Sequence, residues 1–346
     1  MQSTEYAKYR CLLRLNIMSY ATIKIDGSIR DYIKWVLDNR EANKIEPIMF
    51  GEHELKFELD DDLEEFFLQK AQEELRETPE IVAKGHKELA KLIAETPDLL
   101  EYNKPYDEHI YEIFLRPCKW YAESAFALMN RYYRYRQTYS RIFVDFLPSK
   151  QKIGLCSGIL YPMPIRAKDG SRIMIIEGGR LWKPKEHPLD DCWKGVLFLL
   201  TIAMLETKTQ IAGARVIIDV EGLSLRQITY LTPSFAKMVV EFVQKCLPLR
   251  LKSVHIVNQS FIFNVAFAIF KPILEEKFRK RVIFHGTNWE TLIDIIGKNA
   301  LLKKHGGELN MPEDEGWIVK LWQNCFPVEP VLEVLEQHGY KTDIKK

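Results

Sequence analysis

The spacing of hydrophobic residues along the first part of the chain is typical of helices. Between residues 71 and 139, apolar side chains recur every three or four positions, which places them on one helix face. Residues 29–37 have the same spacing, and the acidic run 60–62 precedes a segment whose start negative charge would stabilise. We therefore predict a helical N-terminal unit. Its clearest apolar positions are Ile110, Ile113, Phe114, Ala125, Leu128, Met129, Tyr132 and Tyr133.

The pattern changes after Pro148. Short runs rich in β-branched residues, at 172–176, 215–220, 253–257 and 281–284, alternate with longer helical runs at 191–207, 232–246 and 262–280. Such alternation indicates an α/β unit, in which helices pack on a largely parallel sheet. The expected fold class is thus a helical bundle followed by an α/β unit with a mostly parallel sheet.

Composition narrows the class of protein. The length of 346 residues favours two units, and 49 basic against 48 acidic residues leave a formal net charge of +1, which gives no overall attraction to nucleic acid. The longest apolar runs, such as 196–200, are far shorter than the roughly 20 residues of a membrane-spanning helix. Residues 11–15 are too short and too charged for a signal peptide. We expect a cytoplasmic protein.

Sequence motifs for catalysis are missing. The chain has no phosphate-binding loop, no dinucleotide fingerprint, no G-x-S-x-G elbow and no H-E-x-x-H pair. Its six cysteines form no C-x-x-C pair, and its eight histidines lack the spacing of metal ligands. His255 lies in an apolar run and is expected to be a core histidine. We therefore predict no cofactor, no metal and no enzymatic activity.

The segment from 262 to 281 carries the most specific pattern. Its apolar residues form two adjoining helical stripes that together cover roughly 160° of the helix surface, wider than the stripe of an ordinary surface helix. This favours either a fully buried core helix or a lid over an apolar cavity that also meets lipid. Pro272 predicts a break. The stripes are Ile262, Ala266, Ile269 and Ile273, and Phe263, Phe267, Phe270 and Leu274.

Basic residues flank this segment on both sides. Between residues 245 and 281 the chain has eight basic residues and two acidic ones, although the whole protein is nearly neutral. Favourable charge at a helix C-terminus explains the cluster at 277–281 but not Arg250 and Lys252. A basic rim beside an apolar lid fits docking on anionic lipid, to which each Lys or Arg contributes about 1 kcal/mol.

Several motifs resemble those of the CRAL-TRIO (Sec14-like) lipid-binding family, most closely its branch of tocopherol-transfer, retinaldehyde-binding and clavesin-type proteins. The similarity extends from about residue 55 to 310. It rests on I-I-D-V-E-G-L-S at 217–224, L-T-P-S at 231–234, P-L-R-L-K-S-V-H-I-V-N at 248–258, F-K-P-I-L at 270–274, F-H-G at 284–286, F-L-R at 114–116 and Y-Y-R-Y-R at 132–136.

The resemblance implies four segments. They are an N-terminal extension of unknown role at 1–50, a helical CRAL-TRIO N-terminal bundle at 51–145, a Sec14-like α/β lipid cage at 146–310 and a C-terminal tail at 311–346. A mobile gate helix would close the cage. It falls on residues 262–274, with Phe263, Phe267, Phe270 and Leu274 as its apolar positions.

The resemblance also implies a ligand cavity and a phosphoinositide headgroup site. The cavity residues would be Trp193, Val196, Leu200, Ala214, Ile218, Val239, Phe242, Val243, Leu251, Val254, Phe270 and Leu274. The headgroup residues would be Arg250, Lys252, Lys277 and Arg281.

Two positions depart from the family pattern. Cys118 stands where a second arginine of an L-R-A-R motif would help to bind phosphate. Val196 and Leu200 replace serines that orient the ligand in the tocopherol-binding branch, which implies a drier cavity. A terpenoid, a retinoid, a sterol-like molecule and an acyl chain all stay open as ligands.

Three functions remain to be compared. The leading hypothesis is a non-enzymatic carrier that encloses one hydrophobic small molecule and exchanges it at phosphoinositide-containing membranes, with transient peripheral association. The alternative is a membrane-trafficking adaptor that reads phosphoinositides and in which a cavity lipid serves only structure. An enzyme acting on the lipid is the least favoured, because no reactive constellation is present.

Overall fold

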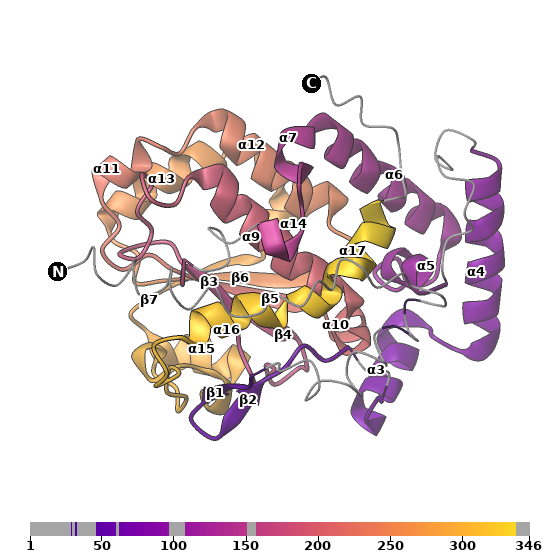
Figure 1. Ribbon diagram of the computed structural model, residues 1–346, viewed down its shortest axis with the longest axis horizontal. Helices are drawn as coiled ribbons and strands as arrows, with labels where there is room; N and C mark the ends of the chain where they lie inside the picture. Colours follow the sequence, from indigo (N-terminus) through magenta and orange to yellow (C-terminus); the bar gives the residue numbers. More distant parts are fainter. Residues whose placement is uncertain are drawn as a thin grey trace.

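The computed structural model describes Ile29, Tyr32 and residues 46–59, 62–96, 108–150 and 157–336. Ile29 and Tyr32 are helical and buried, while the rest of the 29–37 prediction, with residues 60 and 61, lies outside the described part. Figure 1 shows a helical unit at one end of the molecule and a sheet between two layers of other elements.

The predicted helical N-terminal unit is present. It contains α3 (Glu65–Leu75), α4 (Pro79–Ala94), α5 (Glu108–Leu115), α6 (Ala122–Thr138) and the short α7 (Ser140–Phe143). The start of α4 shows how the sequence sets such a boundary. The hydroxyl of Thr78 accepts a hydrogen bond from the amide of Ile81, and Pro79 occupies the first helical position, where no amide hydrogen is needed.

The second unit contains the predicted sheet. Its five strands lie in the order β3 (Leu160–Pro162), β4 (Arg172–Glu177), β5 (Ala214–Asp219), β6 (Leu251–Val257) and β7 (Val282–Gly286). Strands β4 to β7 are parallel and β3 is antiparallel to β4, which confirms the α/β class with a mostly parallel sheet. The sequence did not reveal β3, because three residues are too few to show an alternating pattern.

Helices cover both faces of the sheet (Figure 1). One face carries α9 (Leu189–Leu205), α12 (Pro233–Glu241) with a π-helical turn η4 (Phe242–Cys246), and α13 (Phe261–Phe270). The other carries α15 (Trp289–Ile296), α16 (Trp317–Asn324) and the hairpin β1 (Ile48–Phe50) and β2 (His53–Leu55). The remaining elements are α10 (Thr207–Ala212), α11 (Leu225–Ile228), α14 (Glu276–Arg279), α17 (Glu329–Glu336) and the 3₁₀ turns Pro148–Lys150, Lys298–Ala300, Lys303–His305 and Phe326–Val328.

The segments outside the α/β unit are tied to it and to one another. Lys320 of α16 pairs with Glu46 at 2.7 Å, and the indole of Trp322 donates to the carbonyl of Pro148 at 2.7 Å. Ser149 donates to Glu329 of α17 at 2.7 Å. The hairpin β1–β2 also crosses the predicted boundary at residue 50, and the bounds of the four predicted segments stay predictions.

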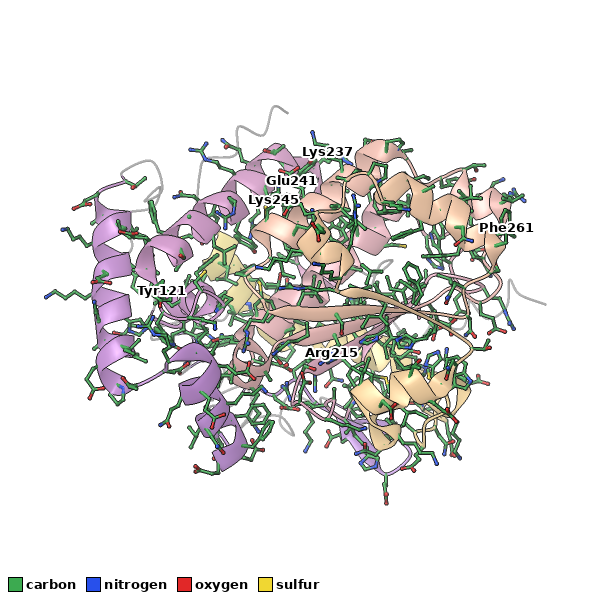
Figure 2. The ribbon with its side chains drawn as sticks, turned by 180° about the vertical axis from the view of Figure 1, so that it is seen from behind. Tyr121, Arg215, Lys237, Glu241, Lys245 and Phe261 are labelled. Carbon is green, nitrogen blue, oxygen red and sulfur yellow. The ribbon has the colours of Figure 1, made fainter. Side chains whose placement is uncertain are left out.

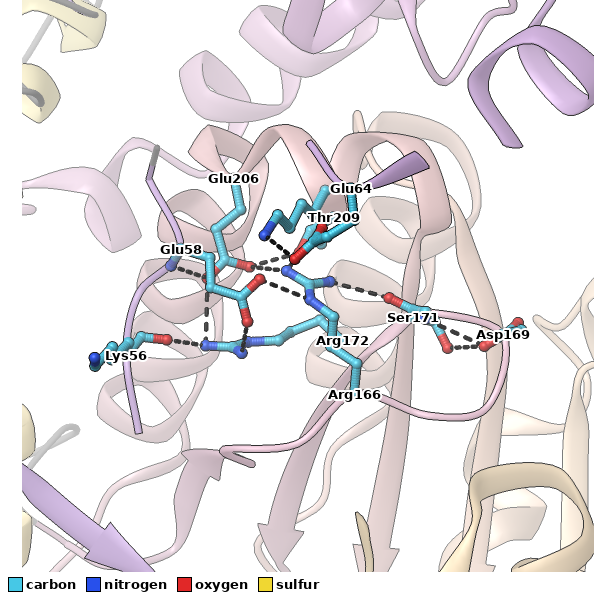
Figure 3. Close-up of polar contacts among 11 residues, drawn as sticks. Lys56, Glu58, Glu64, Arg166, Asp169, Ser171, Arg172, Glu206 and Thr209 are labelled. Atoms are coloured by element: carbon cyan, nitrogen blue, oxygen red, sulfur yellow. Dashed lines mark hydrogen bonds and ion pairs between the residues drawn. The ribbon is translucent and has the colours of Figure 1, made fainter. Parts of the chain in front are cut away.

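A buried ion-pair network fastens the segment before α3 to the sheet (Figure 3). Glu206, at the end of α9, is paired with Arg166 and Arg172, and both arginines also bind Glu58. Burial by itself would raise the pKa of Glu206, but the charges of Arg172 and Arg166 lower it below its ordinary value. The carboxylate therefore stays charged and holds the two arginines in place.

A chain of hydrogen bonds crosses the sheet face that lies opposite α9. Arg215 donates to the hydroxyl of Ser253 at 2.6 Å, and that hydroxyl lies 2.7 Å from His255 Nε2. His255 Nδ1 lies 2.9 Å from His285 Nε2, and His285 Nδ1 lies 2.7 Å from the hydroxyl of Thr291. At the far end of the chain the hydroxyl of Thr291 donates to the carbonyl of Asn288 and so accepts from His285 Nδ1. With both imidazoles neutral, this places the proton of each on Nδ1.

We expect acid to destabilise the fold through this pair. Burial, the neighbouring His285 and Arg215 lower the pKa of His255 to about 3, and burial lowers that of His285. The unfolded chain, with histidine pKa values near ~6.5, therefore binds protons first as the pH falls. The free energy of unfolding should decrease below about pH 6.5, by up to ~1.4 kcal/mol per pH unit for each histidine.

The measurement is urea unfolding at pH 7, 6 and 5. His255→Gln should reduce the slope of unfolding free energy against pH, whereas His53→Gln, at a partly exposed position of β2, should leave it unchanged. Equal slopes for His255→Gln and the wild type would contradict the assignment.

Candidate functional site

A cavity of about 320 Å³ lies between the sheet and the helices α9, α12 and α13. Its floor is made by alternate residues of adjacent parallel strands, because successive side chains of a strand point to opposite faces. Val216 and Ile218 of β5 and Val254 and Ile256 of β6 face the cavity. None of the residues that line it has a charged side chain.

Ten of the twelve residues that the sequence proposed for the lining do line this cavity. They are Trp193, Val196, Leu200, Ile218, Val239, Val243, Leu251, Val254, Phe270 and Leu274. A bulge explains how Leu251 takes part. The pairing of β5 with β6 skips Lys252, so that Leu251 faces the cavity although it is three residues before Val254.

The other two proposed lining residues, Ala214 and Phe242, lie elsewhere. Ala214 begins β5 and contributes to a separate pocket of about 20 Å³ beside Glu206, because the end of α9 covers the sheet at that point. Phe242 begins the π-helical turn, which changes the spacing of side chains along α12. Its ring therefore packs 5.0 Å from Tyr135 and 5.8 Å from Trp193, toward α6.

Helical and strand periodicity missed part of the lining. Trp182, Leu223 and Leu231 lie on connections between elements, and Phe278 lies in the four-residue helix α14. Such short segments show no periodic spacing of hydrophobic residues from which a buried face could be predicted. The one available signal is the large apolar side chain of Trp182 within an otherwise charged and glycine-rich stretch.

The proposed gate residues form one side of α13 and the turn that follows it. Phe263, Phe267, Phe270 and Leu274 all line the cavity, and Phe284 of β7 contacts the ring of Phe267 edge-on at 5.2 Å. The helix ends at Phe270, just before Pro272, where the sequence predicted a break.

The opposite side of α13 faces outward. Phe261 is 81% exposed and Val265 is 42% exposed, so α13 is not a fully buried core helix. Figure 2 shows Phe261 near one end of the molecule, far from Tyr121 of the helical unit. Of the two readings of the 262–281 pattern, the position of α13 agrees with a lid over an apolar cavity.

Three of the four proposed headgroup residues gather at the N-terminal ends of β6 and β7. Arg250 and Lys252 are both ion-paired with Glu74 of α3, the second at 3.3 Å, and Arg281 donates to the carbonyl of Leu251 at 2.8 Å. Lys277, on α14, is exposed. Arg250, Lys252 and Arg281 are thus close in space, and a carboxylate of the helical unit already pairs with two of them.

Glu74 is an ionised partner of Arg250 and Lys252. Burial raises its pKa, but hydrogen bonds from Lys70 and Arg250 and the charge of Lys252 lower it to about 2. Glu74 therefore stays ionised at neutral pH.

The family's arginine motif has a structural role in this chain. Arg116 is buried, pairs with Glu77 at 3.1 Å and Glu112 at 2.9 Å, and reaches Gln210 of α10. Burial raises the pKa of Cys118 to about 11, so its thiol carries no charge at neutral pH. Neither side chain supplies a free charge to the rim.

The CRAL/TRIO domain family matches residues 157–307. "Alpha-tocopherol transfer protein-like" of Mus musculus is 31% identical over 255 residues, which are 74% of each chain. "Clavesin-1" of Mus musculus is 30% identical over 251 residues, 72% of this chain and 70% of the relative. The solved structure entitled "Crystal structure of Sfh5" superposes with a TM-score of 0.53 at 17% identity, over 75% of this chain and 95% of the other, which shows a common fold.

These similarities define a class of lipid-binding and lipid-transfer proteins. The chain belongs to the CRAL/TRIO family. Within the described ranges, no helix is both long and apolar enough to cross a bilayer. No group of three or more metal-ligating side chains occurs in the same ranges.

The cavity makes one structural prediction that needs no knowledge of the ligand. Ala266→Phe places a ring inside the cavity from the gate helix, so uptake of the fluorescent hydrocarbon diphenylhexatriene should fall about tenfold, while thermal stability is kept because the ring fills space. Val265→Phe, at the exposed neighbouring position, is the matched control and should leave uptake unchanged. Equal uptake by both variants would show that the probe binds outside this cavity.

Proposed function

We propose that the protein is a carrier that encloses one hydrophobic small molecule beneath α13 and exchanges it at phosphoinositide-containing membranes. The observation that carries this proposal is a cavity of about 320 Å³ with no charged side chain in its lining, closed on one side by a helix that is apolar both inside and outside. Membership of a lipid-binding family supports the same conclusion. A carrier needs no reactive groups, which agrees with the missing catalytic motifs.

The cavity is large enough for a small lipid. It is about twice the ~150 Å³ of an engineered cavity that holds benzene, and it reaches the lower end of the roughly 300–1,000 Å³ range of ligand pockets. A ligand that buries about 300 Å² of apolar surface gains roughly 7 kcal/mol at ~25 cal/mol per Å². Such a molecule would leave water readily and would stay bound until a membrane accepts it.

The outer side of the gate region supports docking on a membrane. Phe261 and Val265 of α13 are exposed, and so is Leu225 of α11, which packs beside α13. Exposed apolar side chains that gather on one surface are typical of an interaction site. Inserting them into a bilayer would put the gate helix at the lipid surface, where an opened cavity would not meet water.

The basic rim supports recognition of a phosphoinositide. Arg250, Lys252 and Arg281 lie at the strand ends, and Lys277 of α14 follows closely on the turn that ends the gate region. A headgroup phosphate would compete with the carboxylate of Glu74 for Arg250 and Lys252. Headgroup binding would favour an open gate only through a higher affinity for that state.

The docking surface is tested with Phe261→Asp. An aspartate at this position opposes insertion into the bilayer, so the rate of ligand transfer between vesicles should fall at least tenfold while the amount of ligand bound stays the same. Leu68→Asp, at an exposed apolar position of α3, is the control and should transfer at the wild-type rate. If both variants transfer normally, this surface is not the docking surface.

The rim is tested with Lys277→Glu in flotation with vesicles that contain phosphatidylinositol 4,5-bisphosphate. Reversing one exposed charge should weaken binding about five- to thirtyfold, at ~1 kcal/mol for each unit of charge, and less at high salt. Lys87→Glu, on the exposed side of α4, controls for net charge. An equal loss in both variants would mean that only the total charge matters.

The second candidate is a trafficking adaptor that reads phosphoinositides, and the similarity to clavesin-1 together with the rim favours it. The two functions differ in one measurable quantity. Binding of an adaptor to the same vesicles would weaken steeply with salt, and the adaptor would exchange no ligand with them. A carrier would transfer ligand to the vesicles, and the amount transferred would rise with the time of contact.

A further inference from the structure

We infer that the ligand is held without any hydrogen bond, so that the part enclosed by the cavity is a bare hydrocarbon skeleton. This rests on the proposed carrier function and narrows the class of ligand. The inference depends on where the polar atoms of the lining point. Trp182, Cys192 and Trp193 bring side-chain hydrogen-bond donors to the lining, and each donor already has a partner in the protein. The other side-chain heteroatom of the lining is the thioether sulfur of Met174, which is a weak acceptor.

Two of these polar atoms share one acceptor outside the cavity. The indole nitrogen of Trp182 donates to the carbonyl of His187 at 3.1 Å, and the thiol of Cys192 donates to the same carbonyl at 3.6 Å. His187 lies in the connection before α9, behind the cavity wall. Trp182 and Cys192 therefore present their carbon surfaces to a ligand.

The third polar atom points toward the helical unit. The indole nitrogen of Trp193 donates to the hydroxyl of Tyr135 on α6 at 3.2 Å, and that hydroxyl donates to the carbonyl of Met238 on α12 at 3.2 Å. Tyr135 is buried and does not line the cavity. The indole N–H of Trp193 is therefore used in the contact between α6, α9 and α12 and cannot donate to a ligand.

The backbone around the cavity is engaged as well. Strands β4, β5 and β6 exchange amide hydrogen bonds with one another along the floor. At the end of the gate helix, Lys271 donates to the carbonyl of Phe267 and Ile273 to that of Phe270. The carbonyls of Phe267 and Phe270 are therefore satisfied within the protein.

A hydroxyl group on the ligand would consequently be buried without a partner. An unpaired buried hydroxyl is unfavourable, and an apolar pocket rejects a molecule that merely adds a hydroxyl by about tenfold to a hundredfold. The cavity should therefore prefer a hydrocarbon to the alcohol of the same carbon skeleton. Selection among hydrocarbons would then depend on shape alone.

The experiment measures uptake from neutral phosphatidylcholine vesicles, so that both probes start in lipid rather than in water. The delipidated full-length protein is mixed with vesicles that contain equal amounts of farnesene and farnesol, and, separately, pentadecane and 1-pentadecanol. Protein-bound probes are quantified by gas chromatography after separation from the vesicles. In both pairs the hydrocarbon should be taken up at least tenfold more than the alcohol.

Val254→Thr provides a matched test of the cause. It replaces a methyl group of the cavity floor by a hydroxyl of nearly the same shape, so the ratio of hydrocarbon to alcohol should fall about five- to tenfold. Val144→Thr makes the same change at an exposed position outside the gate region and should leave the ratio unchanged.

Each outcome has one meaning. Equal uptake of alcohol and hydrocarbon by the wild type overturns this inference and leaves the carrier function intact. A preference for hydrocarbon that Val254→Thr does not reduce also overturns it, since the selectivity would then arise outside the cavity. Uptake of neither member of either pair contradicts the carrier function itself.

Discussion

The separation of apolar and polar side chains onto the two faces of one parallel sheet is the constraint on which this structure depends. On β5 and β6, Val216, Ile218, Val254 and Ile256 face the cavity. Their sequence neighbours Arg215, Ser253 and His255 form the hydrogen-bonded chain on the other face. Because the side chains of a strand alternate, the same six residues of β5 and seven of β6 provide an apolar floor for a ligand and a polar network that fixes the sheet.

The helical unit is attached to this sheet by ion pairs in addition to a shared apolar core. Glu206 and its two arginines hold the segment before α3, and Glu74 of α3 holds Arg250 and Lys252 at the strand ends. Charged groups can be buried there because each has a partner. The helices α9 and α12 can then leave a space over the apolar floor. The helix α13 covers this space and, within the described part of the chain, packs against other elements only on its inner side, because no other layer lies on its outer side.

The two basic strand ends show how one group of residues can serve both stability and recognition. Arg250 and Lys252 are ion-paired with Glu74, so the helical unit and a membrane headgroup would draw on the same charges. Lys277 is exposed and follows the gate turn, and it is therefore the rim residue best placed to contact a headgroup first. The proposed carrier would in this way combine an apolar interior with a rim in which two of the four charges are already paired with Glu74.

The sequence by itself determined the classes of structure. Periodicity predicted the helical unit and the parallel sheet, since these features depend on neighbours along the chain. The stripe of Phe263, Phe267, Phe270 and Leu274 left a core helix and a lid open, Pro272 predicted a break, and the resemblance to the family implied the gate. The resemblance to the family supplied most of the cavity lining. Only the tertiary structure decided that Ala214 and Phe242 lie outside it, because a covering helix and a π-helical turn act there. It also decided that Glu74 lies among the basic residues and that the indole nitrogen of Trp193 donates to Tyr135, since these partners are distant in sequence and meet only in the folded chain.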